Sequence, residues 1–121
     1  MDAKEILSIA ANAANDKKAK DMFAVYVGDI TALTEYLLMA TATSSTHVRA
    51  LADEVEDKLS KAGVQPHHIE GRSTGWILLD YESVIIHIFN KESREFYSLD
   101  RIWSDGTAIN LDGILTSPRE E

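Results

Sequence analysis

The sequence predicts an α/β (α+β) fold, a layered sandwich in which a mixed sheet of about five strands is flanked by helices. Three observations predict it: two amphipathic helix patterns, two nearly unbroken apolar runs joined by too few residues for a helix, and the size of the chain. With 121 residues, of which 45% are hydrophobic, the chain fits one compact domain. A domain of this size buries roughly two-thirds of its unfolded-chain surface. We expect that domain to span residues 1–109.

The first expected element is an amphipathic helix near the N-terminus. Asp2, followed three residues later by Glu5, has the pattern of a capping box. Behind it, apolar side chains recur at helical spacing, at Ala3, Ile6, Leu7, Ala10, Ala13 and Ala14. The chain is therefore expected to open with a helix that buries one face.

Two short apolar runs and a second helix follow. Met22–Val27 and Glu35–Ala42 are rich in β-branched and aromatic residues, which favours buried strands. Ser44 or Ser45 then caps a helix that ends near Gly63. Its apolar positions repeat at three and four residues, at Val48, Leu51, Ala52, Val55, Leu59 and Ala62. A short strand is expected after Pro66.

The strongest strand signals are the runs WILLDY and SVIIHIF. They predict an antiparallel hairpin that turns at residues 81–83. Because neither run alternates with polar residues, both faces of the sheet are expected to be covered. Residues 90–103 are expected to return across the sheet as a short helix or irregular segment. Residues 110–121 contain Gly and Pro and end in charged residues, which predicts a flexible C-terminal tail.

Composition and charge limit the classes of function. The chain has no cysteine, which excludes disulfides, thiolate catalysis and cysteine-ligated zinc. No run approaches the roughly 20 apolar residues of a membrane span, and the start lacks a basic leader followed by an apolar core, so a cytoplasmic protein is expected. The net charge is −8. Such a surface repels phosphate backbones, so little direct nucleic-acid binding is expected and a basic protein is the natural partner. The one basic cluster, at Lys17, Lys18 and Lys20, is interpreted as a solvated turn.

The sequence contains few candidate nucleophilic sites and few candidate metal sites. Residues 41–46 gather Thr and Ser ahead of His47, where helix amides also favour an anion, but a polar helix N-cap explains them better than a catalytic site. His67 and His68 are adjacent, so on a strand they point to opposite faces and do not share a metal ion. His87, inside VIIHIF, is expected to be buried and neutral. We therefore expect no metal site and no cofactor.

Carboxylates offer another route to catalysis. Asp80 ends the first strand of the hairpin, and it would form an acidic pair if the fold brought Asp100 or Asp105 beside it. Paired acids hold metal ions or perform acid–base chemistry. The spacing leaves this pairing open, and the dispersal of the acids favours turn capping or contact with a basic partner.

Aromatic residues are concentrated between residues 76 and 103. Six of the nine lie there: Trp76, Tyr81, Phe89, Phe96, Tyr97 and Trp103. Phe89 and one of Phe96 or Tyr97 are expected in the core. Because a core does not readily absorb all six beside so many acids, an acidic-rimmed aromatic patch is expected on the surface, of the kind that anchors protein interfaces.

The same residues resemble the ribosomal silencing factor family, also called the Iojap family. The similarity runs through DKKAKDM, EYLLMATATSSTHVRALADEVEDKL, IEG, GWILLDYESVIIHIF and REFYSLDRIWSD, about three quarters of the chain. The chain departs from the family pattern at Tyr26, where the family has Asp, at Thr41–Ala42, where it has Ser-Gly, and at Glu82–Ser83, where it has Gly-Asp. These departures bear on local turn geometry more than on the partner.

The resemblance implies a nucleotidyltransferase-like fold without the catalytic carboxylates. It also implies a non-enzymatic translational repressor that binds ribosomal protein L-fourteen on the large ribosomal subunit and blocks subunit joining when nutrients are scarce. A homodimer away from the ribosome is a further expectation. We expect the contact to use aromatic and Leu anchors and steering acids, at Trp76, Leu78, Asp80, Tyr97, Leu99, Asp100 and Trp103. Two alternatives remain: a nucleotidyltransferase-like enzyme using residues 41–45 with Asp80, and an unrelated protein-interaction module.

Overall fold

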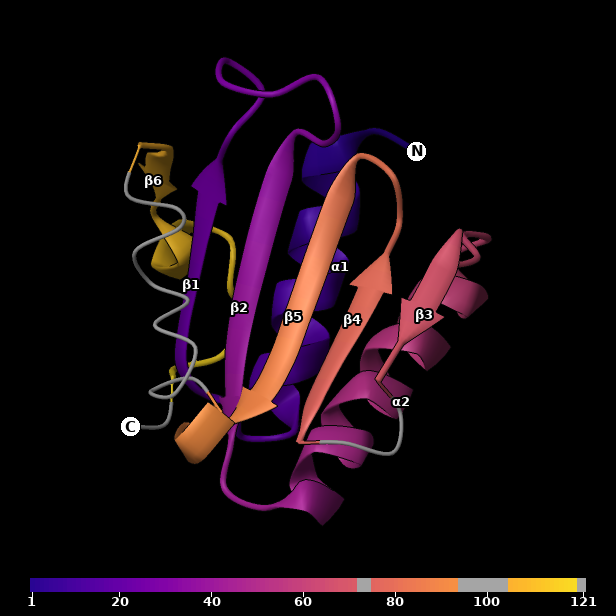
Figure 1. Ribbon diagram of the computed structural model, residues 1–121, viewed down its shortest axis with the longest axis vertical. Helices are drawn as coiled ribbons and strands as arrows, with labels where there is room; N and C mark the ends of the chain where they lie inside the picture. Colours follow the sequence, from indigo (N-terminus) through magenta and orange to yellow (C-terminus); the bar gives the residue numbers. More distant parts are fainter. Residues whose placement is uncertain (72–74, 94–104, 120–121) are drawn as a thin grey trace.

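The computed structural model describes residues 1–71, 75–93 and 105–119, which form one sheet with helices on one face (Figure 1). The two long α-helices are α1 (Ala3–Asp16) and α2 (Ser45–Lys61), and the short 3-10 helix η2 is Leu111–Gly113. Residues 91–93, directly after the last residue of β5, are also helical. The strands are β1 (Lys20–Tyr26), β2 (Tyr36–Ala42), β3 (His68–Glu70), β4 (Trp76–Asp80), β5 (Val84–Asn90) and β6 (Thr107–Ile109). Their order across the sheet is β3-β4-β5-β2-β1-β6. The predicted mixed α/β fold is confirmed.

The sheet is mixed because one neighbouring pair is parallel. β2 and β5 run parallel with Leu38 opposite Ile86, and the other described pairs are antiparallel, including the predicted β4–β5 hairpin. The described sheet has six strands rather than about five. The extra strand, β6, is a three-residue run that pairs with β1. Three residues are too few to show a period of two, so local sequence gave no signal for this strand.

The helix boundaries follow the predicted caps. Asp2 accepts the Glu5 N–H at 2.8 Å and the Glu5 carboxylate accepts the Asp2 N–H at 3.4 Å, which completes the capping box. Ser44 accepts the His47 N–H at 3.1 Å and begins α2. Past the end of α2, Gly63 has φ +90°, a conformation that glycine adopts without steric cost.

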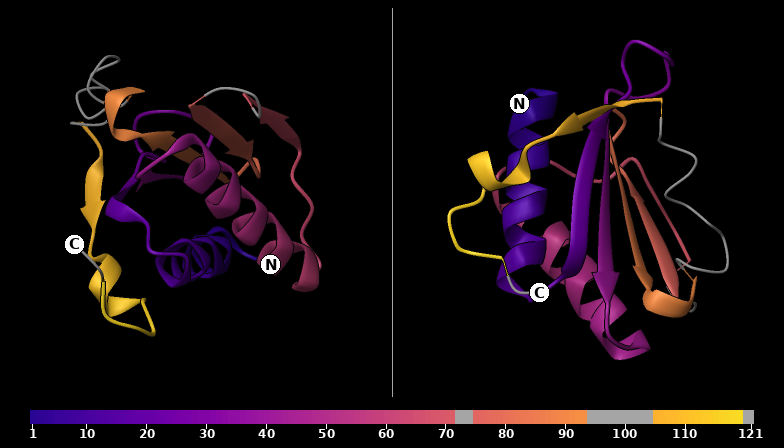
Figure 2. Two further views of the ribbon diagram at one scale, coloured as in Figure 1. Left: turned by 90° about the horizontal axis from the view of Figure 1, so that it is seen from below. Right: turned by 90° about the vertical axis from the view of Figure 1, so that its left-hand side faces the viewer.

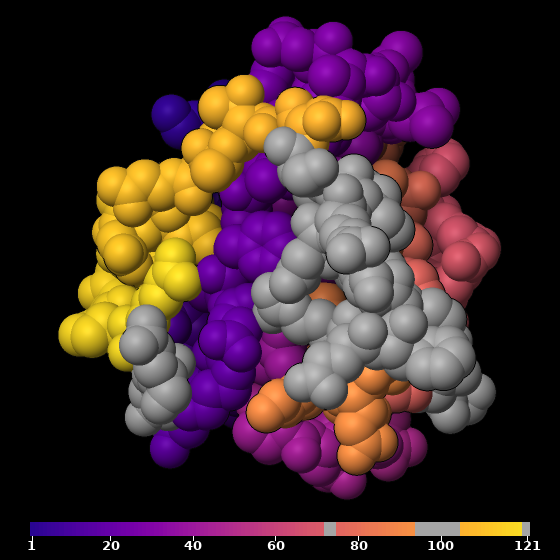
Figure 3. Space-filling view, turned by 60° about the vertical axis from the view of Figure 1, so that its left-hand side comes forward, coloured from indigo at the N-terminus to yellow at the C-terminus, as the bar shows by residue number. Residues whose placement is uncertain are grey.

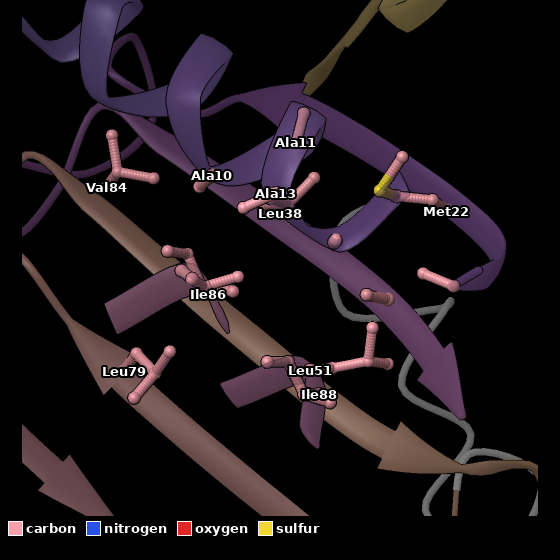
Figure 4. Close-up of a cluster of buried hydrophobic side chains, with 14 of the residues drawn as sticks. Ala10, Ala11, Ala13, Met22, Leu38, Leu51, Leu79, Val84, Ile86 and Ile88 are labelled. Carbon is pink, nitrogen blue, oxygen red and sulfur yellow. The ribbon is translucent and has the colours of Figure 1, made fainter. Parts of the chain in front are cut away.

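Helices α1 and α2 pack on the same face of the sheet (Figure 2). The small side chains of Ala10 and Ala13 let α1 approach the sheet closely, and from α2 Leu51 reaches the same layer (Figure 4). The facing strand residues Leu38 and Ile86 are fully buried. This layer is the main core of the molecule.

The opposite face of the sheet also carries buried apolar side chains, and we call it the open face because neither α1 nor α2 packs on it. Strand periodicity places Val25, Leu37, Met39 and Phe89 there, and each is at most 6% exposed. Buried side chains therefore lie on both faces, as the unbroken apolar runs predicted.

The ends of the strands gather two different groups of loops. The loop end consists of the start of α1, residues 28–35 and the turn 81–83, which border one hollow. The junction end consists of the turn 17–19, the β2–α2 junction 43–47 and the end of β5. Figure 1 shows the loop end at the top and the junction end at the bottom. This division organises the candidate sites.

The C-terminal residues 110–119 pack against α1. Asn12 donates to the Ile114 carbonyl at 3.0 Å and accepts the Thr116 N–H at 2.8 Å. Asn15 donates to the Ser117 carbonyl at 3.0 Å, and Leu111 is 1% exposed. The flexibility expected of residues 110–121 concerns motion and stays a prediction. The hydrogen bonds from Asn12 and Asn15 make this flexibility measurable, because a mobile segment would break them intermittently.

Candidate docking site

Three of the predicted contact residues share the open face. Alternate residues of β4 point to opposite sides, so Ile77 and Leu79 enter the helix-covered core, whereas Trp76, Leu78 and Asp80 lie in one row on the other side. All three are partly exposed. The alternation in WILLD thus assigns Ile77 and Leu79 to the core and leaves the other three residues as candidates for a partner contact.

Trp76 is held by specific contacts. Its ring packs against the buried pair Met39 and Phe89, and its indole N–H donates to Nδ1 of His87 at 3.1 Å. The Trp76 and His87 rings lie 5.8 Å apart, tilted by 37°. Trp76 therefore presents only part of its ring to a partner, and its removal would disturb the open face as well as any interface.

His87 accepts the indole N–H in its neutral form. The side chain is 6% exposed, and burial lowers the pKa of His87 to about 4. A neutral imidazole keeps a lone pair on Nδ1 for the indole N–H, whereas the protonated ring has none. The prediction that His87 is buried is confirmed, its lowered pKa agrees with a neutral ring, and its hydrogen bond orients the Trp76 indole.

Leu78 borders an apolar hollow of about 310 Å³ on the open face. Leu37, Ile85 and His87 form its floor with Leu78, and the loop residues Ile30 and Leu33 form its rim. The hollow is large enough for one or two partner side chains. It joins the predicted β4 row to a loop that the sequence did not single out.

Asp80 has a structural task in the hairpin. Its Oδ1 accepts the Glu82 N–H at 2.7 Å, and Glu82 has φ +69°. Few residues other than glycine adopt that conformation without cost, so the carboxylate supports a strained turn. One carboxylate oxygen is thus used for the turn, which leaves Asp80 as a candidate for steering a partner through its remaining charge.

The rest of the predicted contact set, Tyr97, Leu99, Asp100 and Trp103, lies outside the described residues, as does Phe96. Among the described aromatic residues of the expected patch, Phe89 is 0% and Tyr81 is 5% exposed. Phe89 was predicted in the core and is there. Tyr81 is also buried, because the chain reverses at residues 81–83 and folds this ring inward, so only Trp76 of these three remains available on the surface.

The residues of the nucleotidyltransferase-like alternative lie far apart in the described structure. Asp80 stands opposite Ile85, which pairs with Leu37 on its other side, whereas Thr41 stands opposite Phe89 at the other end of the strands. Four residues of strand separate the two rows by about 13 Å. Asp105 precedes β6, four strands away from β4. The described part of the chain therefore assembles neither the Thr/Ser–Asp80 site nor an Asp80–Asp105 pair.

The polar residues of the junction end are used by the fold. His47 Nδ1 accepts the Thr43 N–H at 2.9 Å, and its Nε2 donates to the Lys17 carbonyl at 2.7 Å. This imidazole ties the turn after α1 to the start of α2. The N-cap interpretation of residues 41–46 is supported, and sequence reasoning missed the tie because its partners lie 30 residues apart.

The described residues also form no cluster of potential metal ligands. Over residues 1–71, 75–93 and 105–119, no group of three or more His, Asp or Glu side chains converges as metal ligands would. His68 instead contacts Glu70 at 2.9 Å on the exposed side of β3. No helix in the same ranges has the length and apolar character needed to cross a bilayer.

Comparison with known proteins identifies relatives along the whole chain. The family model described as "Ribosomal silencing factor during starvation" matches residues 1–121. The protein named ribosomal silencing factor RsfS from Bacillus subtilis is 35% identical over 113 residues, which cover 93% of this chain and 96% of the relative. The protein of the same name from Halalkalibacterium halodurans is 30% identical over 96% of this chain and 100% of its own.

A solved structure shares the fold. A crystal structure of a protein from Chromobacterium violaceum superimposes with a TM-score of 0.82 at 33% identity, covering 85% of this chain and 87% of the other. The structural similarity and the sequence similarity therefore both extend over most of this chain.

Proposed function

Because this chain belongs to the ribosomal silencing factor family, with a match over residues 1–121, we propose that it represses translation by binding the large ribosomal subunit through ribosomal protein L-fourteen. Bound there, it blocks joining of the small subunit when nutrients are limiting. The protein acts by occupying a surface and carries out no reaction. We place it in the cytoplasm.

The observation that carries this proposal in the structure is the row of Trp76, Leu78 and Asp80 on the open face. The row combines a half-buried indole, an apolar side chain at the edge of a hollow and a carboxylate. Aromatic and apolar anchors supply most of the energy of protein interfaces, and the acids steer association with a basic partner. A net charge of −8 suits a basic ribosomal protein and disfavours contact with ribosomal RNA.

Leu78→Ser tests the row with little risk to folding, since Leu78 is only partly buried. We expect binding to purified large subunits, measured by sedimentation, to weaken about tenfold, and inhibition of subunit joining to weaken in parallel. Thr107→Ala, at an exposed position on the far edge strand β6, is the control and should bind as the parent does. Sedimentation with small subunits alone would refute the proposal.

Testing Trp76 requires a substitution that preserves its packing in the fold. Trp76→Ala removes packing on Met39 and Phe89 together with any partner contact, so its unfolding midpoint should fall along with its affinity. Trp76→Phe keeps most of the apolar ring and loses the hydrogen bond to His87. If Trp76→Phe folds normally and binds large subunits weakly, the ring is an anchor; unchanged binding by both variants would remove Trp76 from the site.

The contact with L-fourteen is tested separately from subunit binding. The isolated basic ribosomal protein should bind the parent chain, and Leu78→Ser should weaken that binding by about the same factor as for whole subunits. If the chain binds large subunits and does not bind isolated L-fourteen, it is a ribosomal factor that contacts another part of the subunit, and the L-fourteen contact is refuted.

A further inference from the structure

The loop of residues 28–34 carries exposed apolar side chains that the fold does not use. Among the described residues, the large hydrophobic side chains exposed to solvent are Met1 (57%), Ile30 (55%) and Leu33 (83%). Ile30 and Leu33 belong to this loop, and Met1 borders the same hollow as Leu33. Scattered apolar residues on a surface need no explanation, but here all three gather at the loop end.

The conformation of the loop is fixed by hydrogen bonds within it and at its base. The Ile30 and Thr31 N–H groups donate to the Val27 carbonyl at 3.0 and 3.1 Å. The Leu33 N–H donates to Thr31 Oγ1 at 3.1 Å, and the Val27 N–H closes the base on the Glu35 carbonyl at 2.8 Å. A loop ordered in this way presents its side chains at low entropic cost, which favours binding. Figure 1 shows the loop projecting beyond the ends of the strands, and in Figure 3 purple atoms of this part of the chain form the top of the molecule.

Acidic side chains surround this apolar tip. Asp29 lies within the loop, Glu35 directly follows it, and Glu82 borders the hollow beside it. The nearby Tyr36 phenol has a raised pKa, first because it is partly buried and then because Glu35, Tyr26 and Asp2 disfavour its ionised form. These carboxylates disfavour phosphate groups as the contact and favour a basic protein surface.

The loop is continuous with the predicted docking row. Ile30 and Leu33 form the rim of the apolar hollow whose floor includes Leu78 and His87. A partner that seats side chains against Leu78 would therefore meet the loop at the edge of the same surface.

We propose that residues 28–34 are a second docking element, which places Leu33 and Ile30 in an apolar depression of a basic protein on the large ribosomal subunit. This inference rests on the proposed function and extends its site from the sheet face to the loop end. The acids at the loop base orient the basic partner, and the two apolar side chains supply the contact energy.

The test compares Leu33→Ser and Ile30→Ser with the parent and with Ala32→Ser, an exposed control position in the same loop. Because both target side chains are exposed, the unfolding midpoints should not change. We expect Leu33→Ser to bind purified large subunits about tenfold more weakly, Ile30→Ser less so in line with its lower exposure, and Ala32→Ser as tightly as the parent.

The outcomes separate the two proposals. Failure of the parent chain to sediment with large subunits defeats the proposed function itself. A parent that binds, together with a Leu33→Ser variant that binds within about twofold of it, defeats the loop inference alone.

A photo-crosslinking side chain, p-benzoylphenylalanine at position 33, identifies the occupant. On large subunits we expect an adduct with a basic ribosomal protein. An adduct with RNA alone overturns the inference. An adduct with a second copy of this chain also overturns it, if Leu33→Ser loses self-association and still binds large subunits as the parent does.

Discussion

The two ends of the sheet use polar and apolar residues in opposite ways. At the junction end, Ser44 and His47 are committed to helix capping and to joining the turn at Lys17 to α2. At the loop end, Ile30 and Leu33 are exposed beside Glu35 and Glu82. The end that gathers Thr, Ser and His in the sequence serves helix capping and packing, and the end with no recognisable motif carries the loop that we propose as a docking element. Substitutions at the junction end should therefore change stability, and those at the loop end should change binding.

The largest expected effect comes from His87, which lies on the open face between the two ends. Its pKa is about 4 in the folded protein, against an ordinary value of 6.5. Between those values the unfolded chain binds more protons than the folded one, so stability rises with pH across this window. The neutral His87 thus contributes fully above pH 6.5, and about 3 kcal/mol is lost as the pH falls to 4.

The measurement is urea unfolding of the parent and His87→Gln from pH 4 to pH 7. Glutamine keeps a carbonyl oxygen as acceptor for the Trp76 N–H and does not titrate, so the stability of the variant should depend less on pH in this range. Equal pH dependence in both proteins would show that the open face tolerates a charged His87.

A smaller loss is expected at the junction end. His47→Ala leaves the Thr43 N–H and the Lys17 carbonyl to solvent, which should lower the free energy of unfolding by about 1–2 kcal/mol. Large-subunit binding should stay at the parental level. Arg49→Ala, exposed on the same helix, is the matched control for stability. A His47→Ala variant with parental stability but weak binding would reverse the roles assigned to the two ends.

The smallest effect has the opposite sign. Glu82 has φ +69°, a conformation that costs a residue with a Cβ atom about 1 kcal/mol relative to glycine. Glu82→Gly should therefore raise the free energy of unfolding by up to about 1 kcal/mol, partly offset by the greater entropy of glycine in the unfolded chain. The same variant should lower the rate of association with large subunits at low salt, because it removes one acid of the loop end. Thermal melts and stopped-flow mixing measure the two effects, and a destabilised variant would mean that the Glu82 side chain supports the turn.

Family membership and fold could be predicted because their signals are local or ordered along the chain. The Asp2–Glu5 capping box, the Ser44 cap and the WILLDY–SVIIHIF hairpin each depend on residues close in sequence, and each is present. The shared direction of Trp76, Leu78 and Asp80 follows from strand periodicity alone. The exposed tip at Ile30 and Leu33 carried no such signal, since apolar residues in a loop read equally well as core.

The sequence by itself determined the helices, the main strands, the family and the sign of the charge, because these depend on spacing and composition. Only the tertiary structure decided which polar residues meet. The parallel pairing of β2 with β5 puts Asp80 at the opposite end of the sheet from Thr41, and contact across 30 residues of chain joins His47 to Lys17. Register and long-range packing set these distances, and no local pattern encodes them.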